Sequence, residues 1–213
     1  MVRAAKKNFP SIVLACCLLL GCGKFKQLAY EGIRRDQWQQ PDKVIAALQI
    51  CPGDASADVG AGGGYSTFKL AKAVGPADKV YAVDIDQEMT ELISQQAQKD
   101  AVTNVEAIVA NEDDPFLPKT GVDLLFTGNT YHHLENRVAY FSNPRNYLRP
   151  GGKIAIIDFD RRAWIEGLLR HYTPGEFIKR EMEPAGYRLQ QELEFLDRQS
   201  FIIFIVVKEN QKQ

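Results

Sequence analysis

The sequence predicts an α/β layer fold, in which helices cover both faces of a sheet. After residue 40, short apolar segments alternate with amphipathic ones, as in repeated strand–helix units. The runs DLLF and IAIID are continuously apolar, which suits strands that are buried on both faces of a parallel sheet. A cluster of glycines within residues 60–64 lies where the first strand should turn into a helix.

The helices are predicted from helical spacing and from end signals such as Pro41 in a first turn. Met89, Leu92, Ile93 and Ala97 recur three or four residues apart, which places them on one helical face. The expected helices are one that begins at Pro41 and includes Leu48, then Tyr65–Val74, Gln87–Lys99, Arg137–Leu148, and one that runs from Thr173 through Met182 to an end near Gly186.

The strands are predicted from the short apolar segments between these helices. The expected strands are Ala55–Val59, Lys79–Val83, Val105–Val109, Val122–Thr127, Lys153–Phe159, Tyr187–Phe195 and Ser200–Val207. The last two are joined by only four residues, whereas a parallel connection needs about a dozen or more. They therefore form an antiparallel hairpin, and we expect one reversed strand at the edge of the sheet.

The first 21 residues have the layout of an export signal. Three basic residues precede an unbroken run of nine apolar residues, 12–20, which ends at Gly21-Cys22. Nine residues span about 13 Å as a helix, at roughly 1.5 Å per residue, which is too short for a hydrocarbon core of about 30 Å. A permanent transmembrane helix is therefore not expected.

The segment Leu19-Leu20-Gly21-Cys22 resembles a bacterial lipobox, in which a small residue precedes a cysteine that is lipidated and becomes the mature N-terminus. The resemblance implies a lipid on Cys22 and a membrane-anchored lipoprotein on the periplasmic side. The outer membrane is possible, because Gly23 is not an inner-membrane retention aspartate. The alternative is a cytoplasmic chain whose N-terminus is never processed, or a misassigned start codon.

One domain, residues 41–213, is expected after the signal peptide, residues 1–21, and a polar tether or lead-in helix, residues 22–40. Loss of the signal's three basic residues would leave 23 Lys and Arg against 27 Asp and Glu, a net charge of −4. The sequence has no basic block or basic patch interleaved with aromatic residues, which argues against nucleic acid as a partner. Apart from Cys22, only Cys51 would remain, so neither an intrachain disulfide nor a cysteine-based zinc site is expected.

The most informative segment is ADVGAGGGY, residues 57–65. Glycines at a strand-to-helix turn permit positive φ and close approach of a ligand, and the first N–H groups of the helix can face a polar or anionic group. Twenty residues after Gly64, Asp84 ends the segment VYAVD, where a carboxylate can accept hydrogen bonds from two ribose hydroxyls. The order of strand, loop, helix, strand and acid predicts a nucleoside-binding unit, with a merely tight turn as the alternative.

The dinucleotide fingerprint is G-x-G-x-x-G, but the glycines here stand at 60, 62 and 64, and Tyr65 takes the place of the third glycine. The pattern G-x-G-x-G after an acid, with VDID downstream, resembles motif I and its acidic follower in class I S-adenosylmethionine (SAM)-dependent methyltransferases. VDLLFTGNTYHHL, NYLRPGGKIAIIDF and the final hairpin also match in order, so most of residues 41–207 resembles the type 11 and quinone-biosynthesis-like branch. The resemblance implies SAM as cofactor. It also implies a Rossmann-like three-layer sandwich with a mostly parallel seven-stranded sheet and an antiparallel C-terminal strand.

The family's cofactor contacts can be carried over to the matching positions of this chain. By this resemblance, Asp84 would hold the ribose, and Ile85 would pack on adenine with Asp86 beside it. Asp58 would lie under the loop and orient the amino group of the cofactor's methionine. The other implied cofactor-binding residues are Gly60, Ala61, Gly62 and Gly64 in the loop, Asn111, Glu112 and Asp113 as alternatives for the adenine edge, and Asn129.

The segment Asn129–His133 follows the fourth strand, at the rim where open α/β sheets bind ligands. His132 or His133 could take a proton from an attacking hydroxyl or an acidic carbon, because the imidazole pKa is ~6.5. Tyr131 is a third catalytic candidate or a wall of the cofactor pocket, and His171 is expected on a solvated loop. No metal site is expected, since adjacent histidines on an extended chain point to opposite faces and no third ligand is evident nearby.

The sequence thus predicts transfer of a methyl group from SAM to an unidentified small molecule by a lipid-anchored enzyme, with no protein partner predicted. The segment after the fourth strand lacks the proline pair of nucleic-acid amino-methyltransferases. The alternatives are a catalytically silent SAM-fold binding module and an NAD(P)-dependent oxidoreductase, the latter disfavoured by Tyr65 and the terminal hairpin. Export would conflict with this function, because SAM is made in the cytosol.

Overall fold

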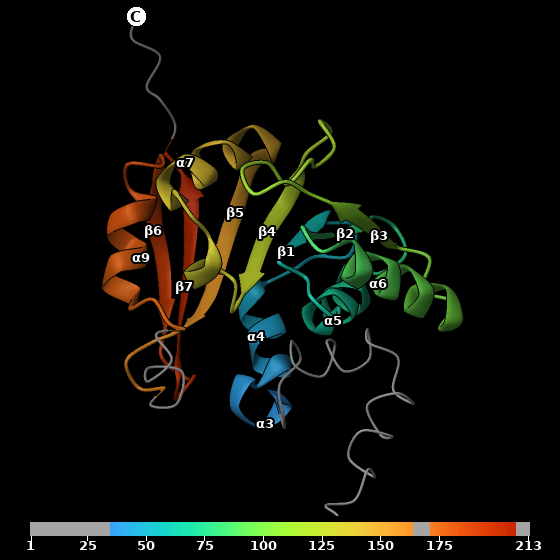
Figure 1. The fold of residues 1–213 in the computed structure, drawn as a ribbon, viewed down its shortest axis with the longest axis horizontal. Helices are drawn as coiled ribbons and strands as arrows, with labels where there is room; N and C mark the ends of the chain where they lie inside the picture. The colour runs from blue at the N-terminus through green and yellow to red at the C-terminus, as the bar shows by residue number, and fades with distance from the viewer. Residues whose placement is uncertain (1–34, 164–170, 208–213) are drawn as a thin grey trace, which may run out of the picture.

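The computed structural model describes residues 35–163 and 171–207, which hold a seven-stranded sheet of order β3-β2-β1-β4-β5-β7-β6. Neighbouring strands among β1 to β5 pair in parallel, and β7 is antiparallel to both β5 and β6. Figure 1 shows the sheet running from β6 to β3. The strands are β1 (Ser56–Val59), β2 (Val80–Asp84), β3 (Val105–Val109), β4 (Val122–Gly128), β5 (Leu148–Phe159), β6 (Tyr187–Leu193) and β7 (Gln199–Val206).

The predicted mostly parallel sheet with an antiparallel C-terminal strand is confirmed, with one correction of position. The reversed strand β7 lies one place in from the edge, because β6 pairs with it and covers its outer side. The strand rich in apolar residues, FIIFIV, is therefore buried, and the polar strand YRLQQEL takes the edge. An edge strand with charged and polar side chains resists pairing with other chains.

Two of the helices, α5 (Tyr65–Val74) and α6 (Gln87–Lys99), have the predicted bounds. The predicted helix Arg137–Leu148 is wrong, because α7 ends at Ser142 and a 3-10 helix begins at Pro144. Proline has no N–H to donate to a continuing helix, which explains the break. The remaining helices are α3 (Arg35–Gln39), α4 (Pro41–Leu48), α7 (Arg137–Ser142), α9 (Gly175–Met182) and the 3-10 helices η1 (Tyr131–His133) and η2 (Pro144–Tyr147). No helix in the described ranges is both long and apolar enough to cross a bilayer.

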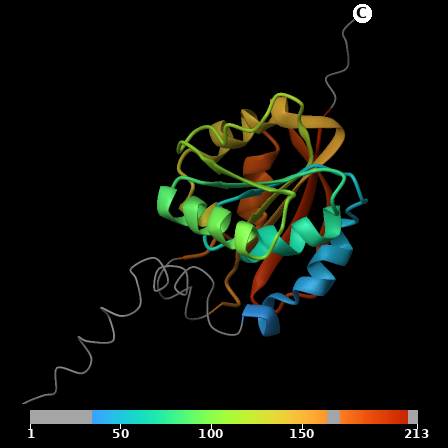
Figure 2. The same cartoon turned by 90° about the vertical axis from the view of Figure 1, so that its right-hand side faces the viewer.

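Helices cover the two faces of the sheet and form two cores. Ile154 and Ile156 of β5 face the core that α7 and α9 cover. The intervening Ala155, with Ile157, faces the core that α4 and α5 cover. Because side chains alternate along a strand, a continuously apolar strand serves both cores at once. Figure 2 shows α5 and α6 on one side of the strands and α7 and η2 on the other.

The last part of the predicted lead-in belongs to the folded domain. The Tyr65 hydroxyl donates to Asp36 Oδ1 at 2.6 Å, and Gln40 Nε2 donates to the Phe195 carbonyl at 2.8 Å. These contacts tie the segment of α3 to α5 and to the loop after β6. The predicted signal peptide and the lipidation site Cys22 lie outside the described residues.

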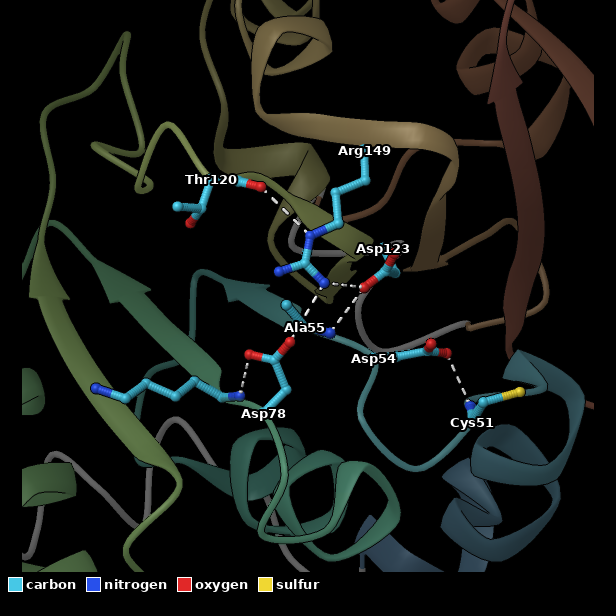
Figure 3. A network of polar contacts seen from close by, with 8 residues as sticks. Cys51, Asp54, Ala55, Asp78, Thr120, Asp123 and Arg149 are labelled. Atoms are coloured by element: carbon cyan, nitrogen blue, oxygen red, sulfur yellow. Dashed lines mark hydrogen bonds and ion pairs between the residues drawn. The ribbon is translucent and has the colours of Figure 1, made fainter.

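A polar network joins the amino ends of four strands, opposite the edge where ligands of such sheets bind. Arg149 at the start of β5 donates to Asp123 Oδ2 at 2.7 Å and to Asp78 Oδ2 at 3.2 Å. The same Asp123 oxygen accepts the backbone N–H of Ala55 at 2.8 Å, just before β1. Figure 3 shows the three charged side chains pointing toward one another. The network therefore fixes how the starts of β1, β2, β4 and β5 lie relative to one another.

We predict that Asp123→Ala lowers the free energy of unfolding by about 1–2 kcal/mol, because it removes a partly exposed ion pair and leaves the Ala55 N–H without its acceptor. Urea denaturation at pH 7 measures the change. Glu192→Ala, which removes the exposed ion pair with Lys179, is the control and should change the free energy by no more than about 0.5 kcal/mol. Equal losses in the two variants would show that the network has no special role.

Candidate active site

A cavity of about 420 Å³ lies at the carboxyl ends of the central strands. Four segments line it: Gly60–Gly63 after β1, Val83–Ile85 across the end of β2, Ala110–Glu112 after β3, and Gly128–Thr130 across the end of β4. The carboxyl ends of parallel strands meet at one edge of a sheet, and ligands of open α/β sheets bind there. The fold therefore brings the predicted loop, Asp84 and the segment after β4 to one site.

The loop after β1 needs glycine at its first position. Gly60 has φ +75°, and a Cβ there would lie 2.2 Å from Oγ1 of Thr130. The Thr130 hydroxyl also lies 3.3 Å from the Gly60 carbonyl, which can accept its hydrogen bond. No side chain fits at Gly60 between the loop and Thr130, so the loop and the segment after β4 are in direct contact there.

Asp84 connects the end of β2 to the loop. Its Oδ2 accepts the Gly62 N–H at 2.7 Å, and its Oδ1 accepts the Asp86 N–H at 2.9 Å. Each carboxylate oxygen has a second lone pair, so hydroxyl groups of a ligand can still donate to it. The next residue, Ile85, is 61% exposed and lines the same cavity. These two side chains suit a ligand in which a ribose is attached to a ring: the ribose hydroxyls can donate to Asp84, and the face of the ring can pack on Ile85.

Asp58, on β1 beneath the loop, is almost fully buried and also lines the cavity. Burial raises the pKa of its carboxyl to about 6, although the Thr67 hydroxyl donates to Oδ2 at 2.7 Å and so favours the charged form. Arg35 of α3 lines the cavity as well, and its positive charge lowers this pKa. Asp58 and Arg35 therefore present a carboxylate and a guanidinium to the same cavity. These two groups suit a ligand that has both an amino and a carboxylate group.

The other predicted cofactor residues divide into two groups. Those that line the cavity with the loop are Gly60, Ala61, Gly62, Asn111, Glu112 and Asn129. Three lie elsewhere. Gly64 precedes α5 with φ +86°, where a Cβ would meet Phe68 at 2.8 Å. Asp86 caps α6 by accepting the Glu88 N–H at 3.1 Å, and Asp113 lines a neighbouring hollow.

Tyr131 does not take the expected place in the cofactor pocket or among catalytic groups. Its side chain is fully buried in the core, where the ring stacks on Phe141 with centroids 5.4 Å apart. Its hydroxyl donates to Glu181 Oε2 at 2.8 Å, and burial raises its pKa far above the usual value. A hydroxyl that is buried and already paired cannot serve as a base, so we assign Tyr131 to anchoring η1 on α9.

The two adjacent histidines lie close together, contrary to the expectation of opposite faces. Residues 131–133 form the 3-10 helix η1 rather than an extended segment, and the rings of His132 and His133 are 4.0 Å apart. His171, expected on a solvated loop, approaches both rings with centroid distances of 5.6 and 5.4 Å. Both premises for excluding a metal site, the extended chain and the missing third ligand, are therefore wrong.

The environments of these two histidines differ. His132 Nδ1 lies 2.7 Å from Oδ1 of Asp158, a fully buried residue of β5 whose pKa is raised by burial. His133 as a whole is exposed, but its ring is partly desolvated where it lines the cavity, and this desolvation, together with the charges of His132 and His171, lowers its pKa to about 4. At pH 7 the imidazole of His133 is neutral, so it can accept a proton or a hydrogen bond from a ligand.

Several residues that line the cavity were not predicted from the sequence. They include Arg35, Ser66, Thr130, Leu134, Glu135 and Tyr140. Thr130 could have been found, because it lies between predicted residues of the segment after β4. Arg35 belongs to no recognisable sequence motif. Its position in the cavity wall depends on how α3 packs against Tyr65, with the guanidinium 4.0 Å from the ring centroid.

Comparison with known proteins gives a consistent result over most of the domain. A family model described as a methyltransferase domain matches residues 52–193. An arsenite methyltransferase from Halobacterium salinarum is 28% identical over 121 residues, which cover 57% of this chain and 30% of that protein. The ubiquinone/menaquinone biosynthesis C-methyltransferase UbiE of Cupriavidus metallidurans is 26% identical over 118 residues, which cover 55% of this chain and 48% of that protein. Matches to these curated relatives thus span between about a third and a half of their lengths.

A similar solved structure covers nearly the whole domain. A SAM-dependent methyltransferase from Aquifex aeolicus superposes with a TM-score of 0.80 at 26% identity, and the match covers 86% of this chain and 98% of that chain.

We predict that Asp58→Asn raises the free energy of unfolding at pH 7 by about 1–3 kcal/mol, since the wild-type carboxyl must ionise in a buried place at a cost of about 1.4 kcal/mol per pKa unit. The folded-state pKa is raised, so the wild type binds more protons when folded, and its stability falls as pH rises from about 4 to about 6. The gain should therefore disappear near pH 4. Chemical denaturation at pH 4, 5, 6 and 7 measures it, with exposed Asp197→Asn as the control. A gain that does not depend on pH would contradict the assignment.

Proposed function

The chain belongs to the methyltransferase domain family, and from that premise we propose that it transfers a methyl group from SAM to a small molecule. The observation that carries the proposal is the pairing of Asp84 and Ile85 at the end of β2, against a glycine loop that has no room for a side chain at Gly60. This arrangement fits an adenosine, and the adjacent Asp58 and Arg35 fit an amino acid. SAM is composed of these two parts.

The residues around the cavity support distinct contacts with SAM. Asp84 would accept hydrogen bonds from the ribose hydroxyls, and Ile85 would pack against the adenine ring. Asn111 or Glu112 would reach the adenine edge, since both line the cavity together with Ile85, whereas Asp113 does not line it. Asp58 would hold the amino group and Arg35 the carboxylate of the methionine part.

The acceptor would bind beside the segment after β4. When bound, SAM supplies a methyl group on a positively charged sulfur, which is already an activated leaving group. The chain must therefore hold the acceptor in line and remove its proton where it has one. His133 lines the cavity and is neutral at pH 7, so it supports this role better than the buried Tyr131.

A small molecule is proposed as the acceptor rather than nucleic acid. The whole chain has a net charge of −1, and the segment Asn129–Tyr131 lacks the proline pair of nucleic-acid amino-methyltransferases. A protein that binds nucleic acid by phosphate contacts needs a basic surface.

We further propose that the enzyme is anchored to a bacterial membrane by lipid on Cys22 and faces the periplasm. The support is the basic start, the short apolar run and the sequence Leu19-Leu20-Gly21-Cys22. On that side of the membrane, SAM would have to be supplied from the cytosol. A cytoplasmic enzyme without the lipid is the alternative.

We predict that Asp84→Ala weakens SAM binding about a hundredfold or more, because two hydrogen bonds to a charged acceptor contribute roughly 1.5–3 kcal/mol each. Titration calorimetry on the intact protein measures the change. Asp100→Ala, at the far end of α6, is the control and should leave the affinity unchanged. NADH fluorescence, measured in parallel, should show no binding. The proposal fails if the intact protein gives no heat with SAM or binds NADH instead.

For the anchor, we expect mass spectrometry to find a lipidated N-terminus at Cys22 and cell fractionation to place the protein in the membrane. Cys22→Ser removes the sulfur that carries the lipid, so this variant should lose the modification and its membrane association. An intact Met1 in the cytosolic fraction would refute the anchor and leave the methyltransferase proposal unaffected.

A further inference from the structure

Three histidines meet beside the cavity, and one of them, His133, lines it. His132 and His133 come from η1, and His171 comes from the segment that leads from β5 to α9. Each ring offers one nitrogen, and these three atoms lie within 4.8 Å of one another. His133 is common to the cluster and to the cavity wall, so the cluster borders the proposed acceptor site.

These three are all the histidines of the 213-residue chain. They come from two segments about 40 residues apart, and local sequence does not explain their meeting. A general base requires one imidazole, and orienting it requires one partner. The presence of a third imidazole within ligand distance calls for another explanation, and imidazole nitrogen is a preferred ligand of zinc and other divalent transition metals.

Asp158, which contacts His132, also supports a metal site. Its carboxylate is fully buried and lies 2.7 Å from His132 Nδ1. A neutral imidazole must donate from Nδ1 in this contact, which leaves Nε2 with its lone pair available. Histidines that bind metals typically donate their other ring nitrogen to a carboxylate in this way. The negative charge also compensates for a cation in the cluster.

We propose that His132, His133 and His171 bind one divalent transition-metal ion, Zn²⁺ foremost. An ion about 2.0–2.1 Å from each nitrogen requires the three atoms to come together by roughly 1 Å. His133 and His171 are exposed, so rotation of their side chains suffices. Three imidazoles leave the fourth position of a tetrahedral ion open, which is the arrangement of catalytic zinc sites.

The role that we give to the metal ion rests on the proposed methyl transfer, and the ion would define the class of acceptor. An ion at the cluster would take a hydroxyl or thiol of the acceptor at its open position and lower its pKa, and the released proton would pass to solvent. The acceptor class would then be a molecule with an oxygen or sulfur donor. The proposal replaces His133 as the base, because a coordinated imidazole has no lone pair free for a proton.

The test is titration calorimetry of the full chain, purified without a polyhistidine tag and treated with EDTA, against ZnCl₂. We expect one ion per chain, and we expect Co²⁺ to give the visible absorption of a four- or five-coordinate site. His171→Ala and His133→Ala should each weaken zinc binding at least tenfold, and Asp158→Asn about 10- to 100-fold. Cys51→Ser is the control, since Cys51 is an exposed thiol that could bind zinc by itself.

SAM affinity and thermal unfolding, measured on the same variants, separate the two proposals. His171 is exposed, so His171→Ala should keep its SAM affinity and its unfolding temperature without metal while it loses zinc. Unchanged zinc binding in His171→Ala, or loss of zinc binding in Cys51→Ser, would overturn the metal site. Zinc binding without SAM binding would overturn the proposed function and leave the metal site in place.

Discussion

The arrangement of the site depends on the close approach of Gly60 to Thr130. A Cβ at Gly60 would lie 2.2 Å from the Thr130 hydroxyl. The loop after β1 and the segment after β4 can therefore approach this closely only because residue 60 is glycine. The next contact, from the Gly62 N–H to Asp84, ties the same loop to β2. Three strand ends are thus held together through one loop, and the cavity is the space that they enclose.

Ionisable groups near this cavity are held at a cost to stability. Asp58 is buried with a pKa raised to about 6, and Asp158 is buried with its pKa raised as well. Burial disfavours the charged form of each carboxyl, and neighbours favour it: Thr67 and Arg35 for Asp58, and His132 and Thr173 for Asp158. A cationic partner supplied by a ligand would compensate for burial at both places. In this view the two acids belong to function rather than to folding.

Most of the fold, and many of the residues that line the cavity, could be predicted from the sequence, because their signals are local. The glycines of the loop, Asp84 at the end of its strand and the spacing within α6 each depend on neighbours in sequence. Pro144 is also a local signal, and it explains why the helix predicted at Arg137–Leu148 ends at Ser142. Arg35 and His171 could not be predicted, since tertiary packing alone brings them to the cavity and to η1.

The segment Asn129–His133 contributes residues to both halves of the site that we describe. Its first residue, at φ +61°, lines the cofactor cavity, and its last two belong to the histidine cluster. Between them, Tyr131 is fixed in the core by Glu181 and Phe141, so the turn cannot move without disturbing α9. In the proposed function, this turn would set the distance between cofactor and acceptor. Because methyl transfer requires in-line geometry rather than strong acid or base, that distance is what the fold must supply.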